Sequence, residues 1–323
     1  MYNICSDEVL SAVLDELFPE HRETISVTLM GDGDRVKLYK VITPGGDGKF
    51  VKIFKHESRE PSLYNSLQSE EMYSNIVCKS GVNHNKQFLV LNDISAEYCD
   101  LRNWSVPVHS IRMEKVLSTV ANFHSILNQK KDNLLKEIGI PWHLESKENY
   151  HKHLDFLERD YKKFLSDMPV EIDSRMQVYF AQSLEFLREN AGHLFDLRHR
   201  NRLSFIHGDL NAGNVYYPVN DGSEVLILDL EAVRLGMVTD DLVMLLVNDL
   251  YHGSDTLLSQ VTSYYSQLHD SMKRTISESD TMNYLKYSIR EGLFFPMKLY
   301  FHNQIVDNDL LMRIIDAYES LVL

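Results

Sequence analysis

The chain contains the stretch FIHGDLNAGNVY at residues 205–216, followed by LILDLE at 226–231. The apolar letters on either side of the polar ones predict short strands with a loop between them. Asn214 follows Asp209 by five residues, and Asp229 follows it by twenty. A carboxylate can accept the proton of an alcohol, and carboxylate and amide oxygens are the ligands that magnesium prefers. The spacing of these three side chains is typical of phosphoryl transfer.

Upstream of these motifs, residues 25–54 show the alternation of a small antiparallel sheet. Ile25, Val27 and Leu29 alternate with polar residues, and glycine-rich turns follow at 31–34 and 44–48. This pattern predicts three strands joined by tight turns. Another short strand is expected at 88–91.

Helical spacing of apolar residues predicts the remaining elements. One short amphipathic helix is expected over 7–18, before the sheet. A second, ending at Gly81, would place five side chains on one face: Leu63, Leu67, Glu70, Tyr73 and Val77. Longer helices are expected after residue 94, over 111–128, 148–167, 174–197 and from 239 to the end. The sequence thus predicts an α+β protein with two parts, 1–94 and 95–323.

Composition narrows the classes of protein that remain. The chain has 323 residues and a formal net charge of −14, of which −4 falls in residues 1–94 and −10 in the remainder. Such acidity argues against a sequence-blind nucleic-acid binder, which needs a basic surface. The chain has three cysteines far apart in the sequence: Cys5, Cys78 and Cys99. This spacing argues against a disulfide framework or a zinc site and favours a cytoplasmic location. No membrane association is expected, since no run of about 18 apolar residues occurs.

On these motifs, the sequence resembles the aminoglycoside phosphotransferase and choline kinase-like group of the protein-kinase-like superfamily. The resemblance rests on H-G-D-x-x-x-x-N at 207–214 and on the strand that ends in Asp-Leu-Glu at 229–231. Gly236, Asp241-Leu242 and the helix segment at 120–125 extend it.

The resemblance implies a two-lobed fold with a small sheet-containing lobe and a larger, mostly helical lobe. It implies that Asp209 is the catalytic base and that Asn214 and Asp229 bind Mg²⁺. By the same resemblance, His207 and Asp241 support the catalytic loop, and ATP or GTP is the phosphoryl donor.

Lys52 is expected to contact the phosphates of the nucleotide. It lies in a strand between two apolar residues, Val51 and Ile53, so its side chain points to the opposite face. The helix that follows should supply a glutamate partner. Glu70 is favoured over Glu71 because it shares the apolar face, and Glu60 ranks third because it precedes Pro61.

The rest of the nucleotide site is predicted from position along the chain. Gly31 and Gly33 occupy the place of a turn that covers phosphates, although the full glycine-rich motif is missing. Backbone groups of Asp93 and Ile94 would contact the edge of the base. Three apolar residues are candidates to sandwich the base: Val36, Val51 and Ile227.

A small hydroxylated acceptor is expected to bind in the second part of the chain. The acidic surplus of this part of the chain would suit a cationic acceptor. An aminoglycoside antibiotic is the leading candidate, with Glu231 as one contact. Metabolic kinases of choline, homoserine or sugars and a Ser/Thr protein kinase remain alternatives, with a regulator that does not catalyse ranked last. His143, His151 and His153 are expected to be solvated.

Overall fold

The computed structural model describes residues 8–20, 24–102, 112–167, 174–197, 203–220, 224–303 and 307–323. Cys5 lies outside these residues. The chain forms two compact units, one of residues 1–99 with 217–231 and the other of residues 100–216 with 232–323. The predicted boundary is a single cut after residue 94, whereas the structure assigns the Asp229 segment to the first unit.

The first unit is built on a five-stranded antiparallel sheet with the strand order β1-β2-β3-β5-β4. Its strands are β1 (Ser26–Asp32), β2 (Val36–Ile42), β3 (Gly48–Phe54), β4 (Val77–Asn83) and β5 (Lys86–Asn92). The predicted three-stranded meander and the strand at 88–91 are all present. Other elements of this unit are α1 (Glu8–Leu17), α2 (Glu60–Leu67), α3 (Glu71–Ser74) and β9 (Leu226–Ile227). Strands β6 (Tyr98–Asp100) and β8 (Val215–Pro218) each run from one unit into the other.

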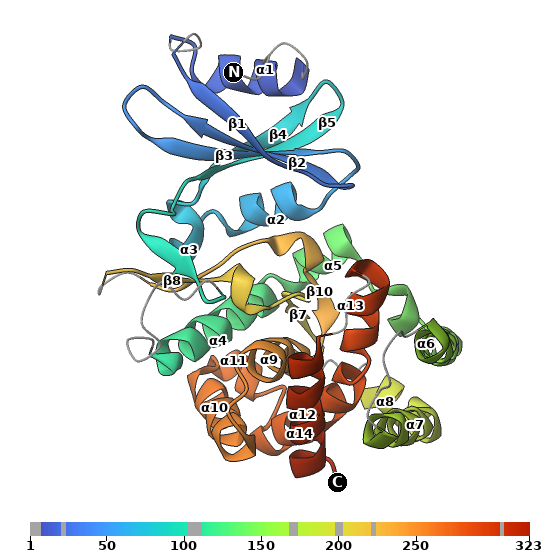
Figure 1. Cartoon of the computed structure of the whole chain (residues 1–323). Helices are drawn as coiled ribbons and strands as arrows, with labels where there is room; N and C mark the ends of the chain where they lie inside the picture. Colours follow the sequence, from blue (N-terminus) through green and yellow to red (C-terminus); the bar gives the residue numbers. More distant parts are fainter. Residues whose placement is uncertain are drawn as a thin grey trace. The chain divides into compact units, whose positions relative to one another are not determined.

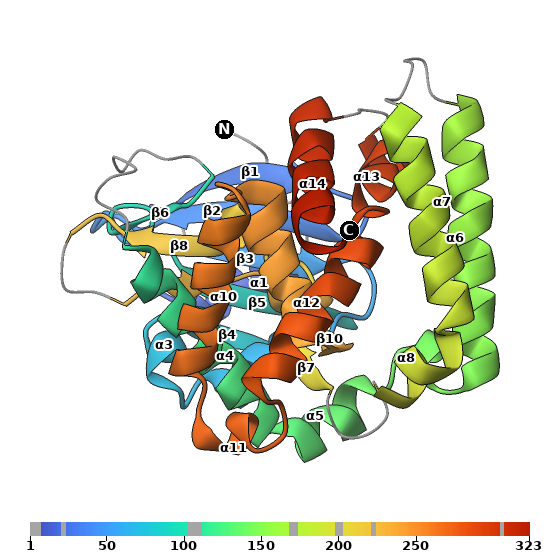
Figure 2. The same cartoon turned by 90° about the horizontal axis from the view of Figure 1, so that it is seen from below.

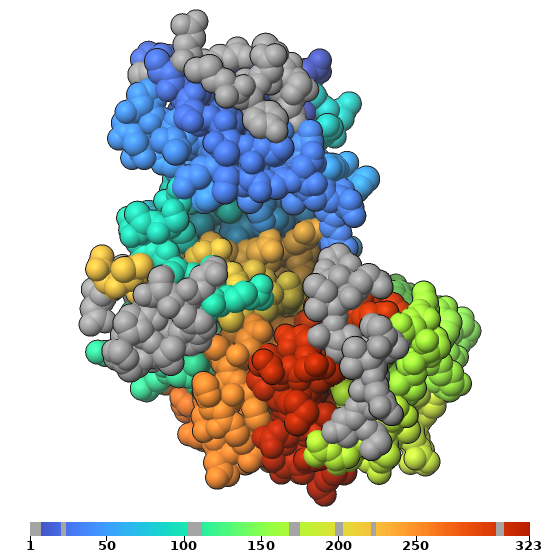
Figure 3. All heavy atoms as spheres, viewed as in Figure 1, coloured from blue at the N-terminus to red at the C-terminus, as the bar shows by residue number. Residues whose placement is uncertain are grey.

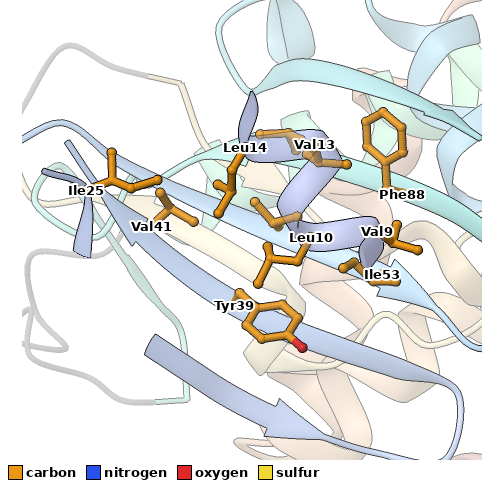
Figure 4. Packing of buried hydrophobic residues seen from close by; sticks show 11 residues of the cluster. Val9, Leu10, Val13, Leu14, Ile25, Tyr39, Val41, Ile53 and Phe88 are labelled. Carbon is orange, nitrogen blue, oxygen red and sulfur yellow. The ribbon is translucent and has the colours of Figure 1, made fainter. Parts of the chain in front are cut away.

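Helices α1 and α2 lie on opposite faces of this sheet (Figure 1). Helix α1 buries Val9, Leu10, Val13 and Leu14 against Val51 and its neighbours in the sheet (Figure 4). Because side chains alternate along β3, Lys52 faces away from this cluster and toward α2. The α1 core therefore fixes which face of the sheet presents Lys52.

The predicted helix that ends at Gly81 is wrong in extent. The chain forms two short helices, α2 and α3, and then enters β4, so Gly81 lies inside a strand. The 3.6-residue spacing arises because Leu63, Leu67 and Tyr73 are all buried, although they belong to separate helices.

The second unit is mostly helical, as predicted. Its longer helices are α4 (Met113–Gln129), α6 (Lys147–Asp167), α7 (Ser174–Glu189), α10 (Ser254–Gln267), α12 (Glu278–Gly292) and α14 (Asn308–Leu321). Shorter elements are α5 (Lys131–Ile138), η3 (Trp142–Leu144), α8 (Ala191–Leu197), η5 (Ala212–Asn214), α9 (Val238–Leu242), η7 (Val243–Asp249), α11 (Asp270–Lys273) and α13 (Phe295–Asn303). Helices α6 and α7 lie side by side (Figure 2), and α10, α12 and α14 form adjacent parts of one surface (Figure 3).

A two-stranded antiparallel ladder sits among these helices. Strand β7 (Ser204–Ile206) pairs with β10 (Arg234–Gly236), and helices α4 and α9 pack against β7. The predicted α+β class is confirmed. None of the helices among the described residues is long and apolar enough to span a bilayer.

Candidate active site

In the first unit, Lys52 lies between two carboxylates. Its Nζ is 2.7 Å from Glu60 Oε1 and 2.8 Å from Asp229 Oδ1. Glu60 is only 1% exposed, whereas the Asp229 side chain is 48% exposed. A buried glutamate therefore holds the ammonium group beside an accessible aspartate.

The partner of Lys52 is Glu60, not Glu70 as predicted. Glu60 begins helix α2, with Pro61 in its first turn, and this helix packs under the sheet. Glu70 instead has an extended backbone and serves as the N-cap of α3. Proline in the first turn is a known signal of a helix start, and it could have identified Glu60.

The charges of this group are strongly coupled. Burial alone would lower the pKa of Lys52, but the charges and hydrogen bonds of Glu60 and Asp229 outweigh it and keep the pKa above its usual value. Burial raises the pKa of Glu60 to about 7, against the opposing charge of Lys52. Lys52 therefore stays cationic at neutral pH, while Glu60 is poised to take up a proton.

Asp229 adopts a left-handed backbone conformation with φ of +66°. Aspartate tolerates this conformation better than most residues, and such strain is common at functional sites. The backbone N–H of Asp229 donates to the buried hydroxyl of Tyr64, at 3.1 Å. Helix α2 therefore supplies both Glu60 and the anchor of Asp229, and sequence reasoning missed Tyr64.

Glu231 is two residues beyond Asp229 and forms an ion pair with Arg35. Its Oε1 lies 3.2 Å from Nη1 of Arg35, and Arg35 lies in the turn between β1 and β2. The predicted contact of Glu231 with the acceptor stays a prediction.

The β1–β2 hairpin has the predicted glycines at its end. Gly31 lies in β1, and the Gly33 N–H donates to the Val36 carbonyl at 3.1 Å. Val36 pairs with Phe54, two residues from Lys52, so both share a face with Lys52. Val51, by contrast, belongs to the core on the α1 side and faces away from Lys52, so it is not available to sandwich the base.

Asp93 and Ile94, which are predicted to contact the base, already use some of their backbone groups in hydrogen bonds within the protein. The Asp93 N–H donates to the Gly48 carbonyl, and the Ile94 carbonyl accepts from Glu97 and Tyr98. These two backbone groups are therefore not available to a nucleotide. Burial would raise the pKa of Asp93, but Lys40 and Ser95 hold it below its usual value.

Ile227 is fully buried, and its carbonyl accepts from the Tyr73 hydroxyl at 2.9 Å. This bond fixes the strand that leads to Asp229.

In the second unit, the loop after β7 carries His207, Gly208 and Asp209. Gly208 has φ of +80°, and an added Cβ would lie 2.3 Å from the Ala232 carbonyl oxygen. Only glycine fits this position without displacing the backbone. The glycine therefore sets the conformation of the loop immediately before Asp209.

Asp241 anchors this loop from α9. Its carboxylate accepts from the His207 N–H at 2.7 Å and the Gly208 N–H at 2.9 Å. It also lies 3.0 Å from His124 Nε2, and His124 Nδ1 lies 2.7 Å from the Tyr264 hydroxyl. Burial would raise the pKa of Asp241, but the bond and charge of His124 and the N–H of Gly208 keep it low.

The side chain of His207 completes the turn, because its Nδ1 accepts from the Asp209 N–H at 3.3 Å. Sequence reasoning identified His207 and Asp241 as supports but missed that His124 and Tyr264 complete the network.

Asn214 returns to the same loop. Its Nδ2 donates to the Asp209 backbone carbonyl at 2.8 Å, and Asn211 Nδ2 donates to that carbonyl at 3.2 Å. The Ala212 N–H is held by Asp249 Oδ2 at 2.5 Å. Asp249 ends η7, a π-helical segment, and such segments are frequent at functional sites.

Two cavities in this unit are lined by Asp209. The larger has a volume of about 460 Å³ and the smaller about 410 Å³. Both are also lined by Met244, Asn248 and Phe295. The half-buried carboxylate of Asp209 is therefore accessible to a small molecule.

Asn214 and Asp229 each carry a donor atom of the kind that a magnesium ion prefers. The amide nitrogen of Asn214 is bonded to the loop, which leaves its oxygen for a ligand role. Asp229 offers an accessible carboxylate. Mg²⁺ favours such hard oxygen donors.

Comparisons with known proteins agree with this picture. Residues 115–274 match the family described as the phosphotransferase enzyme family. This segment contains His124, the loop at 207–214, Asp229 and Asp241. No curated protein sequence matches the chain.

Solved structures share the fold at low sequence identity. The choline kinase LicA from Streptococcus pneumoniae is 14% identical, with coverage of 97% of this chain and 98% of that one and a TM-score of 0.54. A protein from Ralstonia eutropha described as an aminoglycoside phosphotransferase is 16% identical, with coverage of 96% and 95% and a TM-score of 0.56. The amicoumacin kinase hAmiN, in complex with AMP-PNP, Ca²⁺ and Ami, is 15% identical, with coverage of 91% and 87% and a TM-score of 0.53.

The predicted resemblance is therefore confirmed. Residues 115–274, which carry both motifs, belong to the phosphotransferase enzyme family, and the similar solved structures share the fold of the chain.

Proposed function

We propose that this protein is a small-molecule kinase that transfers the γ-phosphate of ATP, or of GTP, to a hydroxyl group. One observation carries the proposal: Asp209 lines two cavities, while Asp241 holds the preceding residue, Gly208, and Asn214 holds the Asp209 carbonyl. A fixed carboxylate next to an acceptor cavity suits a general base, since the base must lie within reach of the proton it removes.

Asp209 would accept the proton as the acceptor oxygen attacks phosphorus. Its backbone is fixed by bonds to His207, Asn211 and Asn214, so the carboxylate is already in place when the acceptor binds. Because the carboxylate is positioned before the reaction, less entropy is lost on reaching the transition state.

Lys52 would neutralise charge on the phosphates of the donor. The carboxylates of Glu60 and Asp229 hold its ammonium in one place. Asn214 and Asp229 would hold Mg²⁺, which supplies further neutralisation of the phosphate charge when bound. Gly31, Gly33, Val36 and Ile227 remain proposed nucleotide contacts, as do the groups of Asp93 and Ile94 that are not already bonded.

For the acceptor, the predicted small cation of aminoglycoside type is the first candidate, and antibiotic resistance would follow from it. Its support is the acidic surplus of residues 95–323 and the names of two similar structures, an aminoglycoside phosphotransferase and an amicoumacin kinase. Glu231 stays the proposed acidic contact, and a cytoplasmic location stays a proposal.

A metabolic kinase is the second candidate, and a specific observation favours it. The side chains of two cations of the larger cavity, Arg234 and Lys298, have no hydrogen bond or ion pair with any part of the chain that the structure describes. Such a wall would repel a polycationic antibiotic.

The decisive experiment is a screen of hydroxylated acceptors with ATP and with GTP, read as the mass gain of one phosphoryl group. We expect transfer by the wild type and none by Asp209→Asn. Equal nucleotide consumption by both proteins with every acceptor would refute the enzyme mechanism and favour a regulator. Phosphorylation of peptides only would instead favour a protein kinase.

The metal assignment needs a separate measurement. Asp229→Ala should abolish the magnesium-dependent part of nucleotide binding in calorimetry, and unchanged binding would remove Asp229 from the metal site.

A further inference from the structure

We propose that the acceptor of this kinase carries an acidic group, a carboxylate or a phosphate ester, which Arg234 and Lys298 bind in the larger cavity. This inference rests on the proposed function, because it assigns an acceptor class to the cavity that Asp209 lines. It departs from the cationic acceptor that net charge suggests.

Arg234 lies next to the catalytic loop. A Cβ added at Gly208 would lie 3.1 Å from Arg234 Nε, and one added at Gly236 would lie 3.1 Å from its Nη1. The guanidinium group therefore rests against the backbone of the residue that precedes Asp209. An acid bound there would bring an alcohol on the same small molecule close to Asp209.

Lys298 lines the same cavity from α13. Burial lowers the pKa of Lys298, and the charge of Arg234 adds to the lowering. The charges of Glu291 and Asp240 oppose it. The two cations thus repel each other across the cavity wall. An anion between them would relieve this repulsion and would accept hydrogen bonds from both.

The acidic side chains of the cavity are engaged within the protein. Asp240 accepts from the Ser288 hydroxyl at 2.7 Å and from the Met237 N–H at 3.2 Å, in the first turn of α9. Glu291 lies 3.5 Å from the Tyr150 hydroxyl. By contrast, the side chains of Arg234 and Lys298 have no hydrogen bond or ion pair with the described residues. The charges of Glu291 and Asp240 act on Lys298, but the hydrogen-bond donors of both cation side chains are unoccupied among the described residues.

Two further polar groups on the cavity wall could contact an acid or its hydroxyls. His143 and His153 stack with ring centroids 4.7 Å apart, and both line the cavity. Both rings are half-buried and His151 is exposed, so the expectation that these three histidines are solvated stays a prediction.

The test compares binding of matched acceptors in the absence of nucleotide. Isothermal titration calorimetry would use glycerate, gluconate and glucose 6-phosphate as acids, with glycerol, glucose and glucosamine as neutral and cationic counterparts. We expect at least one acid to bind at least tenfold more tightly than its counterparts. The double variant Arg234→Gln/Lys298→Gln should lose this preference, by about tenfold to hundredfold in affinity.

The controls separate charge from folding. Arg274→Gln/Lys286→Gln removes two exposed cations of the same unit and should bind like the wild type. Arg234→Lys/Lys298→Arg keeps both charges and should retain a preference for the acid. A melting temperature for each variant checks that it is folded.

Several outcomes would overturn the proposal. These are tighter or equal binding of glucosamine, no binding of any acid, and a preference that survives in the double variant. A loss confined to Arg313→Gln would move the acid to the smaller cavity, which that arginine lines. Weakened binding of magnesium AMP-PNP with unchanged acid binding would show that the cations serve the donor phosphates.

The same experiment distinguishes this inference from the proposed function. Acid binding without phosphorylation of any acceptor would leave the anion site in place and refute the kinase mechanism. Phosphorylation of glucosamine in preference to every acid would support the kinase mechanism and refute the anion site.

Discussion

Replacing Asp241 by asparagine tests whether the buried network holds the catalytic loop. The Asp241 carboxylate is 1% exposed and is bonded to two consecutive backbone N–H groups, those of His207 and Gly208. It also meets His124 Nε2. Asparagine has nearly the same size, so the substitution changes the charge and the donor pattern without opening a cavity.

The magnitude follows from those bonds. All three partners of Asp241 donate, whereas asparagine has one accepting oxygen and an amide nitrogen that also donates. At least one buried donor therefore loses its partner, which costs about 1–3 kcal/mol. Loss of the charge adds to this, and breaking a buried charged pair costs about 3–5 kcal/mol in total. For a unit of about 200 residues, this lowers the melting temperature by roughly 6 °C or more.

Thermal unfolding and phosphoryl transfer should be measured together. We expect the lower melting temperature and a fall in kcat, since the loop before Asp209 loses its anchor. Asp309→Asn, at an exposed position of α14, should change the melting temperature by less than 1 °C, roughly the effect of a surface substitution. A melting temperature of Asp241→Asn within about 2 °C of the wild type, with unchanged kcat, would refute this reasoning.

The stabilisation that Asp241 provides also depends on pH. Because the folded-state pKa of Asp241 is lowered, its stabilisation is present above the unfolded value of about 3.9 and disappears as the pH falls through the folded value. The difference in stability between wild type and Asp241→Asn should therefore shrink in acid.

Three further predictions concern the groups around Lys52 and the loop glycine. Glu60→Gln should weaken binding of magnesium AMP-PNP by about tenfold or more because Lys52 loses its buried anionic partner, whereas Glu70→Gln should stay within twofold. Burial raises the pKa of Glu60 to about 7, so its stabilisation is complete below the unfolded value and is lost as the pH rises through 7. Relative to Glu60→Gln, the wild type should therefore lose unfolding free energy, on the order of 3 kcal/mol, between pH 5 and pH 8 in urea titrations. Gly208→Ala should abolish phosphoryl transfer in the acceptor screen, because its Cβ would overlap the Ala232 carbonyl; near-normal kcat would contradict the assigned loop geometry.

The sequence predicts the elements that follow from local patterns. Alternation and glycine-rich turns locate β1, β2 and β3, and the spacing around Asp209 locates the catalytic loop. The single helix predicted through Leu67 and Tyr73 is wrong because residues buried in two different helices happen to keep helical spacing. Periodicity records burial, and it cannot distinguish one helix from two that contribute to one core.

The site residues that sequence reasoning missed depend on contacts across elements. Glu60 reaches Lys52 only because α2 begins at that residue and packs on the face that Lys52 occupies. Arg234 becomes relevant only when β10 pairs with β7 and places it against Gly208. Neither residue lies in a motif: Pro61 marks where α2 begins, but only tertiary packing shows that Glu60 reaches Lys52 and that Arg234 reaches Gly208.

The same distinction decides what the net charge of −14 means for the acceptor. The prediction of a cationic acceptor counts every acidic residue equally. In the structure, two of the most deeply buried acids, Glu60 and Asp241, are bonded to a lysine and to a histidine. In the larger cavity, Asp240 is bonded to Ser288, while Arg234 and Lys298 have no such partner among the described residues. The acids of this cavity, Asp209, Asp240 and Glu291, outnumber its two cations, so its net charge does not decide the acceptor. The proposal of an acidic acceptor rests instead on the donor groups of the Arg234 and Lys298 side chains, which no hydrogen bond within the described residues occupies.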